Sequence, residues 1–370
     1  MNIFYDGIIF HLQKYGGINR YFIELIKNLE NYDDLSMFLF RFSDLFEKNE
    51  NLIIREPIKY LSKIPKVRGF LKKIDSVFLP YLVNKFDSDI YHTTYYRVPE
   101  NIKAFKVITV YDLIYKKFYK SSKEADTFIE RQMKCIKSAD AIIAISENTK
   151  KDILEYNNVP ESKIMVTYLA VSKDFRKATE DEKNTIRKKY NLNKPFILYV
   201  GLREGYKNFI TLLKAYSKWN KSQDFELVCV GGRKVFSKDE IAIIKNARIE
   251  NSVKLLTGIN DKEIMALYSS AHVFVYTSLY EGFGFPPLEA MNCGTPVIVS
   301  NTSSIPEIVG DAGIYFDPSS EEELIARLDQ ITDSADFSKQ LIKKGLERAK
   351  LFNWENTAKE TYEIYKSFRK

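Results

Sequence analysis

The sequence lacks several features that would place it in a specialised class of protein. No apolar stretch approaches the roughly 20 residues needed to cross a bilayer, so we expect no transmembrane helix. The N-terminal residues MNIFYDGIIFHLQ contain neither the basic region nor the cleavage site of a secretory signal, so we expect a cytoplasmic protein. The three cysteines, Cys135, Cys229 and Cys293, match no metal-binding or redox spacing, and we interpret them as small buried residues in a reducing compartment.

A large excess of charge of one sign is also missing. The chain contains 56 basic and 49 acidic residues, and a net charge of +7 would suit nucleic acid, anionic lipid or a phosphorylated ligand. The excess is concentrated in residues 59–73, KYLSKIPKVRGFLKK, where six basic residues and no acidic residue are interleaved with apolar side chains. This segment predicts contact with an anionic surface. The alternative is a solvated basic face whose apolar residues pack on the first half of the chain.

The length and the order of the apolar segments predict two domains. At 370 residues the chain exceeds what one hydrophobic core usually fills. Helical patterns at 17–30, 124–138 and 147–157 separate apolar runs that are typical of buried parallel strands. The expected strands are Ile3–Phe10, Val107–Tyr111, Ala141–Ile145 and Ile164–Leu169 in the first half, and Phe196–Gly201, Phe225–Gly231, Val253–Gly258, Val273–Tyr276 and Val297–Ser300 in the second.

This alternation of strand and helix predicts a doubly wound α/β sheet in each half. We expect a first domain at 1–172, a second at 173–352, and a C-terminal helix at 353–370 that packs back on the first domain. In open α/β sheets the ligand crevice lies outside the carboxyl ends of the strands, so we expect a ligand there, in the cleft between the domains.

The segment YEGFGFPPLEA, residues 280–290, combines a glycine-rich turn with two carboxylates. A Gly-Phe-Gly turn after a strand, followed by prolines that open a helix, directs backbone N–H groups outward and binds phosphate oxygens without a metal. Glu281 and Glu289 flank this turn, and carboxylates accept hydrogen bonds from sugar hydroxyls. The alternative is an ordinary Gly-Pro turn with two solvated glutamates.

The block at 280–310 resembles the E-x7-E signature of the family 4 glycosyltransferases, which have the GT-B fold of two Rossmann-like domains facing a cleft. The resemblance continues in CGTPV and IPEIVG within this block, in LTGIND at 256–261 and VGLREGYKN at 200–208, and weakly at 6–29. It implies a retaining transfer of a hexose from a nucleotide-sugar to a glycan or lipid-linked acceptor, with no cofactor and no metal. The enzymes it resembles build surface polysaccharides, such as lipopolysaccharide, from the cytoplasmic side, some as peripheral membrane proteins.

The resemblance also implies roles for individual residues. Glu289 would bind the ribose hydroxyls, Glu281 the transferred sugar, and Arg203 and Lys207 the diphosphate. A bidentate Arg and a point-charge Lys could stabilise the anionic leaving group as Mg²⁺ does elsewhere. The alternative for Arg203 and Lys207 is ordinary surface charge after a strand. Further implied donor contacts are Gly16, Gly17, Gly231 with Gly232 and Arg233, Thr257, Gly258, Ile259, Gly282, Phe283, Gly284 and Phe285.

The first domain departs from the family pattern at one position. Many members have His-Asp at the end of a strand, where this chain has Tyr111-Asp112, and we interpret both residues as part of the catalytic site. Tyrosine donates a hydrogen bond but is a poor proton carrier near pH 7. His92, at the end of the preceding strand, is a candidate acceptor contact together with Lys63, Lys66 and Arg68, and the alternative is a structural histidine.

Four other functions compete with a glycosyltransferase. An epimerase would need histidines around the sugar, and the chain has three in all. A sugar phosphorylase would need a separate phosphate or cofactor motif, and nucleic-acid binding would leave the E-x7-E block unexplained, so we expect no nucleic-acid partner. A non-catalytic sugar-nucleotide-binding subunit is the fourth. For the donor we favour GDP-mannose over a UDP-hexose.

Overall fold

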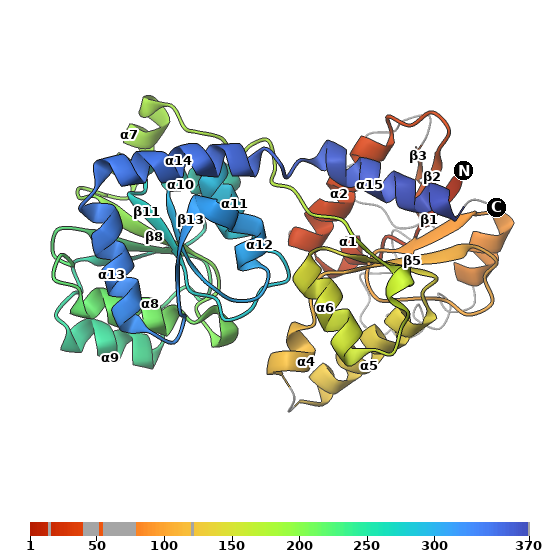
Figure 1. The fold of residues 1–370 in the computed structure, drawn as a ribbon, viewed down its shortest axis with the longest axis horizontal. Coiled ribbons are helices and arrows are strands. Elements are labelled where there is room, and N and C mark those ends of the chain that lie inside the picture. Colours follow the sequence, from red (N-terminus) through yellow and green to blue (C-terminus); the bar gives the residue numbers. More distant parts are fainter. Residues whose placement is uncertain (14–15, 40–51, 55–78, 120–121, 369–370) are drawn as a thin grey trace. The chain divides into compact units, whose positions relative to one another are not determined.

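The computed structural model describes residues 1–13, 16–39, 52–54, 79–119 and 122–368, and its contacts divide the chain into two compact units. The first unit combines Met1–Leu169 with Trp354–Lys370, and the second is Ala170–Asn353 (Figure 1). These bounds lie within three residues of the domain bounds predicted above. Among the described residues, no helix is long and apolar enough to span a membrane.

The first unit is built on a seven-stranded sheet in which every described pair is parallel, in the order β3-β2-β1-β4-β5-β6-β7. The strands are β1 (Asn2–Tyr5), β2 (Ser36–Leu39), β3 (Leu52–Ile54), β4 (Ile90–Thr93), β5 (Phe105–Val110), β6 (Ala141–Ala144) and β7 (Ile164–Val166). Sequence order reverses between β1 and β4, which is the topological switch point of a doubly wound sheet. The observed sheet therefore agrees with the predicted fold class.

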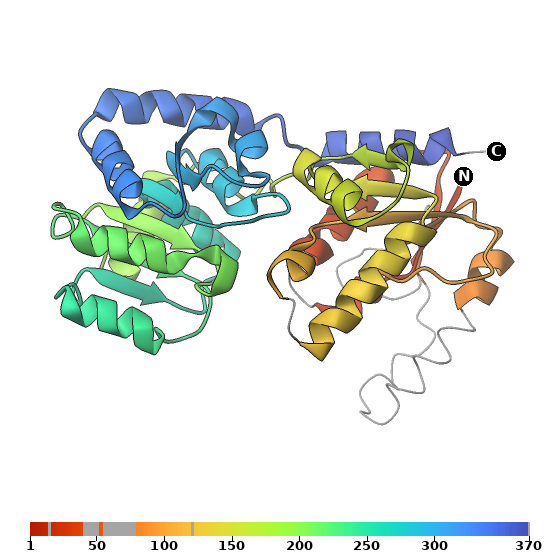
Figure 2. The same cartoon turned by 60° about the horizontal axis from the view of Figure 1, so that its bottom comes forward.

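Helices cover both faces of this sheet. They are α1 (Ile8–Leu12), α2 (Gly17–Leu29), α4 (Ile114–Phe118), α5 (Lys123–Ser138), α6 (Glu147–Tyr156) and α15 (Trp354–Ser367). The Ser122 and Ser146 side chains accept hydrogen bonds from backbone N–H groups in the first turns of α5 and α6, which fixes where these helices begin. The C-terminal helix α15 packs against α2, and Figures 1 and 2 show α2, in red, and α5, in yellow, on opposite faces of the strands.

The first predicted strand, Ile3–Phe10, is wrong beyond Tyr5. Gly7 has a left-handed φ of 59°, which turns the chain into α1, and the Asp6 carboxylate accepts a hydrogen bond from the Ile8 N–H at 3.1 Å. Asp6 also accepts bonds from the hydroxyls of Tyr91, Thr93 and Thr94. The apolar residues Ile8 to Phe10 therefore belong to a helix that follows the switch point.

The second unit contains a six-stranded parallel sheet in the order β10-β9-β8-β11-β12-β13. The strands are β8 (Phe196–Val200), β9 (Glu226–Val230), β10 (Val253–Leu256), β11 (Val273–Tyr276), β12 (Val297–Ser300) and β13 (Gly313–Phe316). Sequence order reverses between β8 and β11, so the ligand crevice of this sheet is expected outside the carboxyl ends of these two strands.

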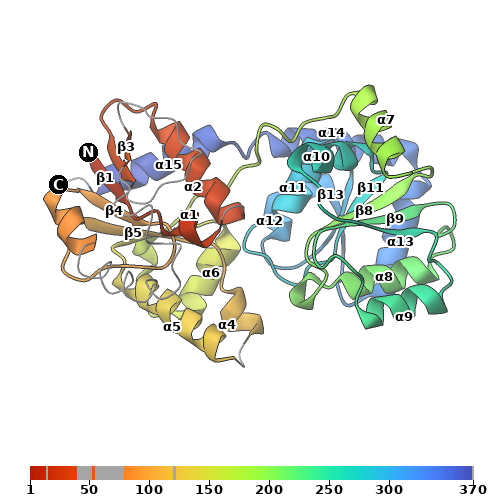
Figure 3. The same ribbon diagram turned by 180° about the vertical axis from the view of Figure 1, so that it is seen from behind.

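Helices cover both faces of the second sheet as well (Figure 3). Helices α8 (Phe209–Lys218), α9 (Lys238–Asn246) and α13 (Glu321–Thr332) lie on one face. Helices α7 (Glu180–Lys189), α10 (Asp261–Ser270), α11 (Phe285–Asn292) and α14 (Ala335–Ala349) lie on the other, and the short helix α12 (Ile305–Val309) follows β12. Capping boxes at Thr179, Ser237 and Asn260 define the starts of α7, α9 and α10.

Candidate functional site

A charged pair lies at the switch point of the second sheet. Lys207 ends a short turn (Gly205–Lys207) after β8, and Glu281 lies in the loop after β11. The Lys207 Nζ atom is 2.6 Å from Glu281 Oε1 and 3.1 Å from the Tyr276 hydroxyl. The two charged side chains are only 13% and 11% exposed, so little water screens their interaction. The structure thus brings together two of the residues that the sequence assigned to one site.

The Glu281 carboxylate is held by several donors. Its Oε1 atom accepts hydrogen bonds from the Tyr276 hydroxyl at 2.7 Å and the Ser278 hydroxyl at 2.5 Å, in addition to the Lys207 ammonium. Its backbone N–H donates to Ser303 Oγ at 3.0 Å, and its carbonyl accepts from the Ser304 hydroxyl at 2.9 Å. Both the main chain and one carboxylate oxygen of Glu281 are therefore fixed.

The turn after Glu281 leads directly into α11. Gly284 has a φ of 120°, a backbone conformation that other L-residues rarely adopt, and the Ser304 hydroxyl bonds the Phe283 carbonyl at 2.8 Å. Pro286 and Pro287 are suited to the first turn of a helix because the N–H groups there lack intrahelical partners. The amino end of α11 carries partial positive charge, which favours an anionic ligand beside Lys207.

Glu289 lies one turn further along α11 and is half-buried. Its Oε2 atom accepts a hydrogen bond from the Tyr268 hydroxyl of α10 at 3.1 Å. Burial and the Glu289 charge raise the pKa of Tyr268 well above its usual range, so Tyr268 remains a donor to this carboxylate at neutral pH. Glu289 is thus oriented by a neighbouring helix, and its ribose-binding role stays a prediction.

Arg203 does not join the Lys207–Glu281 pair. Its side chain is buried, and its guanidinium donates to Glu240 Oε1 and to the backbone carbonyls of Gly231, Arg233 and Val235, at 2.7–3.1 Å. All three nitrogens are therefore used within the protein. Its partners are Glu240 in the first turn of α9 and the carbonyls of the β9–α9 connection, which Arg203 braces, and its diphosphate-binding role stays a prediction.

Two of the predicted glycines of the second domain, Gly231 and Gly258, lie directly after the carboxyl ends of strands. Gly231 has a φ of 97°, and a Cβ atom there would lie 2.9 Å from the Gly201 carbonyl oxygen, so only glycine lets the ends of β8 and β9 approach this closely. Thr257 and Gly258 are exposed after β10. These positions share the carboxyl edge of the sheet with Lys207, and their contacts with a nucleotide stay predictions.

The predicted residues of the first domain occupy a separate unit. Gly16 and Gly17 form the start of α2, and Tyr111 and Asp112 follow β5. The Asp112 carboxylate accepts a hydrogen bond from the Ile114 N–H at 3.0 Å, at the start of α4. Tyr111 is buried, contacts the Tyr21 ring, and its hydroxyl has no hydrogen-bond partner among the described residues. Their catalytic roles stay predictions.

His92 is an interior residue, which corrects its assignment as an acceptor contact. The side chain is 0% exposed, and its Nδ1 and Nε2 atoms lie 2.5 Å from the Tyr365 hydroxyl of α15 and 2.9 Å from Thr109 Oγ1. Tyr365 also bonds the Tyr5 hydroxyl at 3.0 Å. His92 therefore joins the sheet to the C-terminal helix. Lys63, Lys66 and Arg68, with the rest of 59–73, lie outside the described residues, so their contacts stay predictions.

The burial of His92 predicts a loss of stability in acid. Burial lowers the pKa of His92 to about 3, so the folded protein keeps this side chain neutral until the pH approaches that value. In the unfolded chain the same side chain takes up a proton as the pH falls below about 6.5. Between pH 7 and pH 4.5 this costs the first unit on the order of 2 kcal/mol of unfolding free energy. Urea unfolding followed by the fluorescence of Trp354 in a Trp219→Phe background, compared with and without His92→Gln, measures it. An equal loss in both proteins would assign the effect to other groups.

Several residues of the site were not predicted from the sequence. Tyr276 and Ser278 bond Glu281, Ser303 and Ser304 hold its backbone, and Tyr268 bonds Glu289. A signal was present for Tyr276, because its hydroxyl is the polar end of an otherwise apolar strand, VFVY. Nothing in their spacing singles out the serines.

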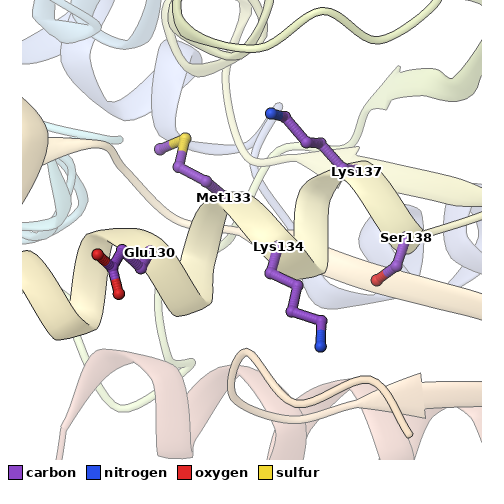
Figure 4. Close-up of a pocket in the computed structure, with 5 residues that line it drawn as sticks. All are labelled: Glu130, Met133, Lys134, Lys137 and Ser138. Atoms are coloured by element: carbon purple, nitrogen blue, oxygen red, sulfur yellow. The ribbon is translucent and has the colours of Figure 1, made fainter. Parts of the chain in front are cut away.

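Other surfaces offer less chemistry. A shallow pocket of about 520 Å³ is lined by Glu130, Met133, Lys134, Lys137 and Ser138, all of which belong to α5 (Figure 4). In the part of the chain that the structure describes, no group of three or more His, Cys, Asp and Glu side chains could hold a metal ion.

The comparisons with known proteins agree on one family. A family model described as Glycosyltransferase Family 4 matches residues 15–175, and one described as Glycosyl transferases group 1 matches residues 182–348. The chain is 29% identical over 365 residues to the O-antigen chain mannosyltransferase B of Escherichia coli, covering 95% of this chain and 96% of that protein. It is 28% identical over 306 residues to the O-antigen chain mannosyltransferase RfbU of Salmonella typhimurium, covering 79% and 80%. The structure of Anabaena Alr3699/HepE in complex with UDP and glucose is similar with a TM-score of 0.73, at 15% identity over 99% of each chain.

Two doubly wound parallel sheets and a matching solved structure define the class: a glycosyltransferase with the GT-B fold. The two family models together reach from residue 15 to residue 348 with a short gap. The chain belongs to the family 4 glycosyltransferases. Membership decides for a glycosyltransferase and against the alternatives that the sequence left open.

Proposed function

We propose that this chain is a retaining, metal-independent hexosyltransferase of surface polysaccharide synthesis. It takes a hexose from a nucleotide-sugar and transfers it to a glycan or lipid-linked saccharide. The Lys207–Glu281 pair at the switch point between β8 and β11 carries the proposal, because it places one cation and one carboxylate where open α/β sheets bind nucleotides. The proposed place of action is the cytoplasmic face of a membrane.

The proposed chemistry depends on charge stabilisation. The Lys207 ammonium has three protons, and its bonds to Tyr276 and Glu281 use two of them, so one N–H is left for a phosphate oxygen. Negative charge grows on the leaving diphosphate, and fixed positive groups there stabilise the transition state more than the ground state. The leaving oxygen itself accepts the proton of the acceptor hydroxyl on the same face of the sugar, so no protein nucleophile is required.

The names of two relatives favour one nucleotide-sugar as the donor. The Escherichia coli and Salmonella typhimurium proteins are named as mannosyltransferases, which favours GDP-mannose. The Anabaena structure holds UDP and glucose, which makes a UDP-hexose the second candidate. A thermal-shift panel with GDP, UDP, ADP and dTDP tests this choice, since a ligand at 100 times its Kd stabilises by about 2.7 kcal/mol. Stabilisation by none of the four nucleotides would contradict the proposed function.

Glu289→Ala is expected to weaken binding of the preferred nucleotide by roughly 1.5–3 kcal/mol, because a charge-assisted hydrogen bond to the ribose is lost. Calorimetric titration measures this loss. Glu347→Ala is the matched control, because Glu347 is an exposed helical glutamate of the same unit. Equal affinity in Glu289→Ala and wild type would contradict the ribose assignment.

Turnover is expected to survive an excess of EDTA with a change of less than about twofold. The proposed positive field comes from Lys207 and the amino end of α11, so it needs no divalent cation. Initial rates with and without EDTA, and after addition of Mg²⁺ or Mn²⁺, are the measurement. Loss with EDTA and recovery with metal would contradict this account.

A further inference from the structure

Tyr276 bridges the two charged groups of the candidate site. Its hydroxyl lies 2.7 Å from Glu281 Oε1 and 3.1 Å from Lys207 Nζ, and these two atoms are themselves 2.6 Å apart. The three groups therefore form a closed triangle. Tyr276 is the last residue of β11, so its position is set by the central part of the sheet.

The direction of each hydrogen bond in this triangle follows from the chemistry of its members. An ammonium group can only donate, and an ionised carboxylate can only accept. The Tyr276 hydroxyl must therefore accept from Lys207 and donate its single proton to Glu281. Burial and the Glu281 charge raise the pKa of Tyr276 well above its usual range, so this proton is present at neutral pH.

The Tyr276 ring is also held firmly. It is 1% exposed and stacks on Phe274, with ring centroids 5.9 Å apart. The Lys207 ammonium lies 5.5 Å from the Tyr276 ring centroid, beyond the hydroxyl that it bonds. A rigid side chain thus presents its hydroxyl to Lys207.

The triangle determines which atoms face a ligand. Lys207, Tyr276 and Ser278 all donate to Oε1 of Glu281, so Oε2 is the oxygen that sugar hydroxyls can use. Lys207 likewise keeps one N–H for a phosphate oxygen. Without the Tyr276 hydroxyl, the Lys207 ammonium loses one of its two acceptors and can move towards Glu281 Oε2. The remaining N–H of Lys207 and the Oε2 atom of Glu281 would then bond each other instead of a ligand.

We propose that Tyr276 is a positioning residue of the donor site, whose hydroxyl holds Lys207 beside Glu281 and directs its remaining N–H towards the diphosphate. This inference rests on the proposed function of that site. It differs from a packing role, because it requires that the effect of Tyr276 act through Lys207.

Tyr276→Phe removes only the hydroxyl and is expected to lower kcat about tenfold, the effect of losing one hydrogen bond to a charged group. The donor KM should change less than about threefold, because the misplaced groups matter most where charge develops in the transition state. Tyr216→Phe is the matched control. Tyr216 is a fully buried tyrosine of α8 in the same unit, and its hydroxyl hydrogen-bonds the carbonyls of Ser222 and Phe225. We expect unchanged turnover in this control.

A double-mutant cycle with Lys207→Ala tests whether the loss of kcat in Tyr276→Phe acts through Lys207. In the Lys207→Ala background, Tyr276→Phe should reduce the remaining kcat by less than about twofold. A second tenfold loss there, or no loss in the wild-type background, would overturn the positioning role. Full activity of Lys207→Ala would refute the proposed function itself.

If the wild type turns over none of the tested donors, the proposed function fails and the same four proteins are compared by urea unfolding of the second unit. Coupling between Tyr276 and Lys207 in the unfolding free energy would then support the bridge. Additive unfolding free energies would overturn it.

Discussion

Lys207→Ala should lower kcat/KM by about a hundredfold, which is the usual result of removing one preorganised donor from a developing anion. Two physical losses add to each other. The diphosphate loses a cation that is only 13% exposed and therefore weakly screened, and Glu281 loses the partner that neutralises its charge beside an anionic ligand. Steady-state kinetics with the preferred donor measure the effect.

Lys254→Ala provides the control for this experiment. Lys254 forms a comparable ion pair in the same unit, with its Nζ atom 2.7 Å from Glu226 Oε1, but it lies on β10 and not at the switch point. Its replacement should leave kcat/KM within about twofold of the wild type, since this pair, only 23% and 7% exposed, contributes to stability and not to the charge at the switch point. Equal losses of activity in the two variants would mean that Lys207 acts only through folding.

Arg203→Ala should lower the free energy of unfolding of the second unit by roughly 3–5 kcal/mol, because it leaves the buried Glu240 carboxylate without its cation. The same change removes the donor of three backbone carbonyls in the β9–α9 connection. Trp219 is the one tryptophan of the second unit, so its fluorescence during urea unfolding, in a Trp354→Phe background, reports this unit alone.

Arg233→Ala is the matched control for Arg203. Arg233 pairs with Glu204 at 2.6 Å, yet its side chain is largely exposed, so its loss should cost about 0–1 kcal/mol. If Arg203→Ala instead kept its stability and lost nucleotide affinity, the diphosphate role that the sequence indicated would be supported. Unfolding free energy and nucleotide affinity, both measured on Arg203→Ala, distinguish these two outcomes.

The sequence predicted best where local pattern alone determines structure. Unbroken apolar runs such as Ala141–Ile145 became strands, within one or two residues, because a parallel strand buried on both faces needs no polar position. The strands β2, β3 and β13 were missed, and β2 and β13 begin with a polar residue or a glycine, Ser36 and Gly313. Gly7 shows the opposite error, since a single left-handed residue ends an apolar run that otherwise reads as one strand.

The site was predictable to the extent that its chemistry depends on neighbours in sequence. Glu281 follows a strand and precedes a glycine turn, so its place at the sheet edge could be inferred. The orientation of the Arg203 side chain could not be inferred, because it depends on Glu240, which lies 37 residues later in the sequence. His92 is the clearest case: its partner Tyr365 is 273 residues away, and no local pattern distinguishes a histidine that faces a ligand from one that a distant helix covers.

The return of the chain to the first unit at Trp354 determines the order in which the protein can fold during synthesis. The second unit, Ala170–Asn353, is continuous and is complete before the ribosome has made α15. The first unit begins earlier but still lacks the helix that covers His92 and Tyr5 when Asn353 is added to the chain. The first unit can therefore be completed only after the whole of the second unit has been synthesised. A stop codon at position 354 would leave this half-covered state permanently, exposing the apolar surface of α2 and β1 to aggregation.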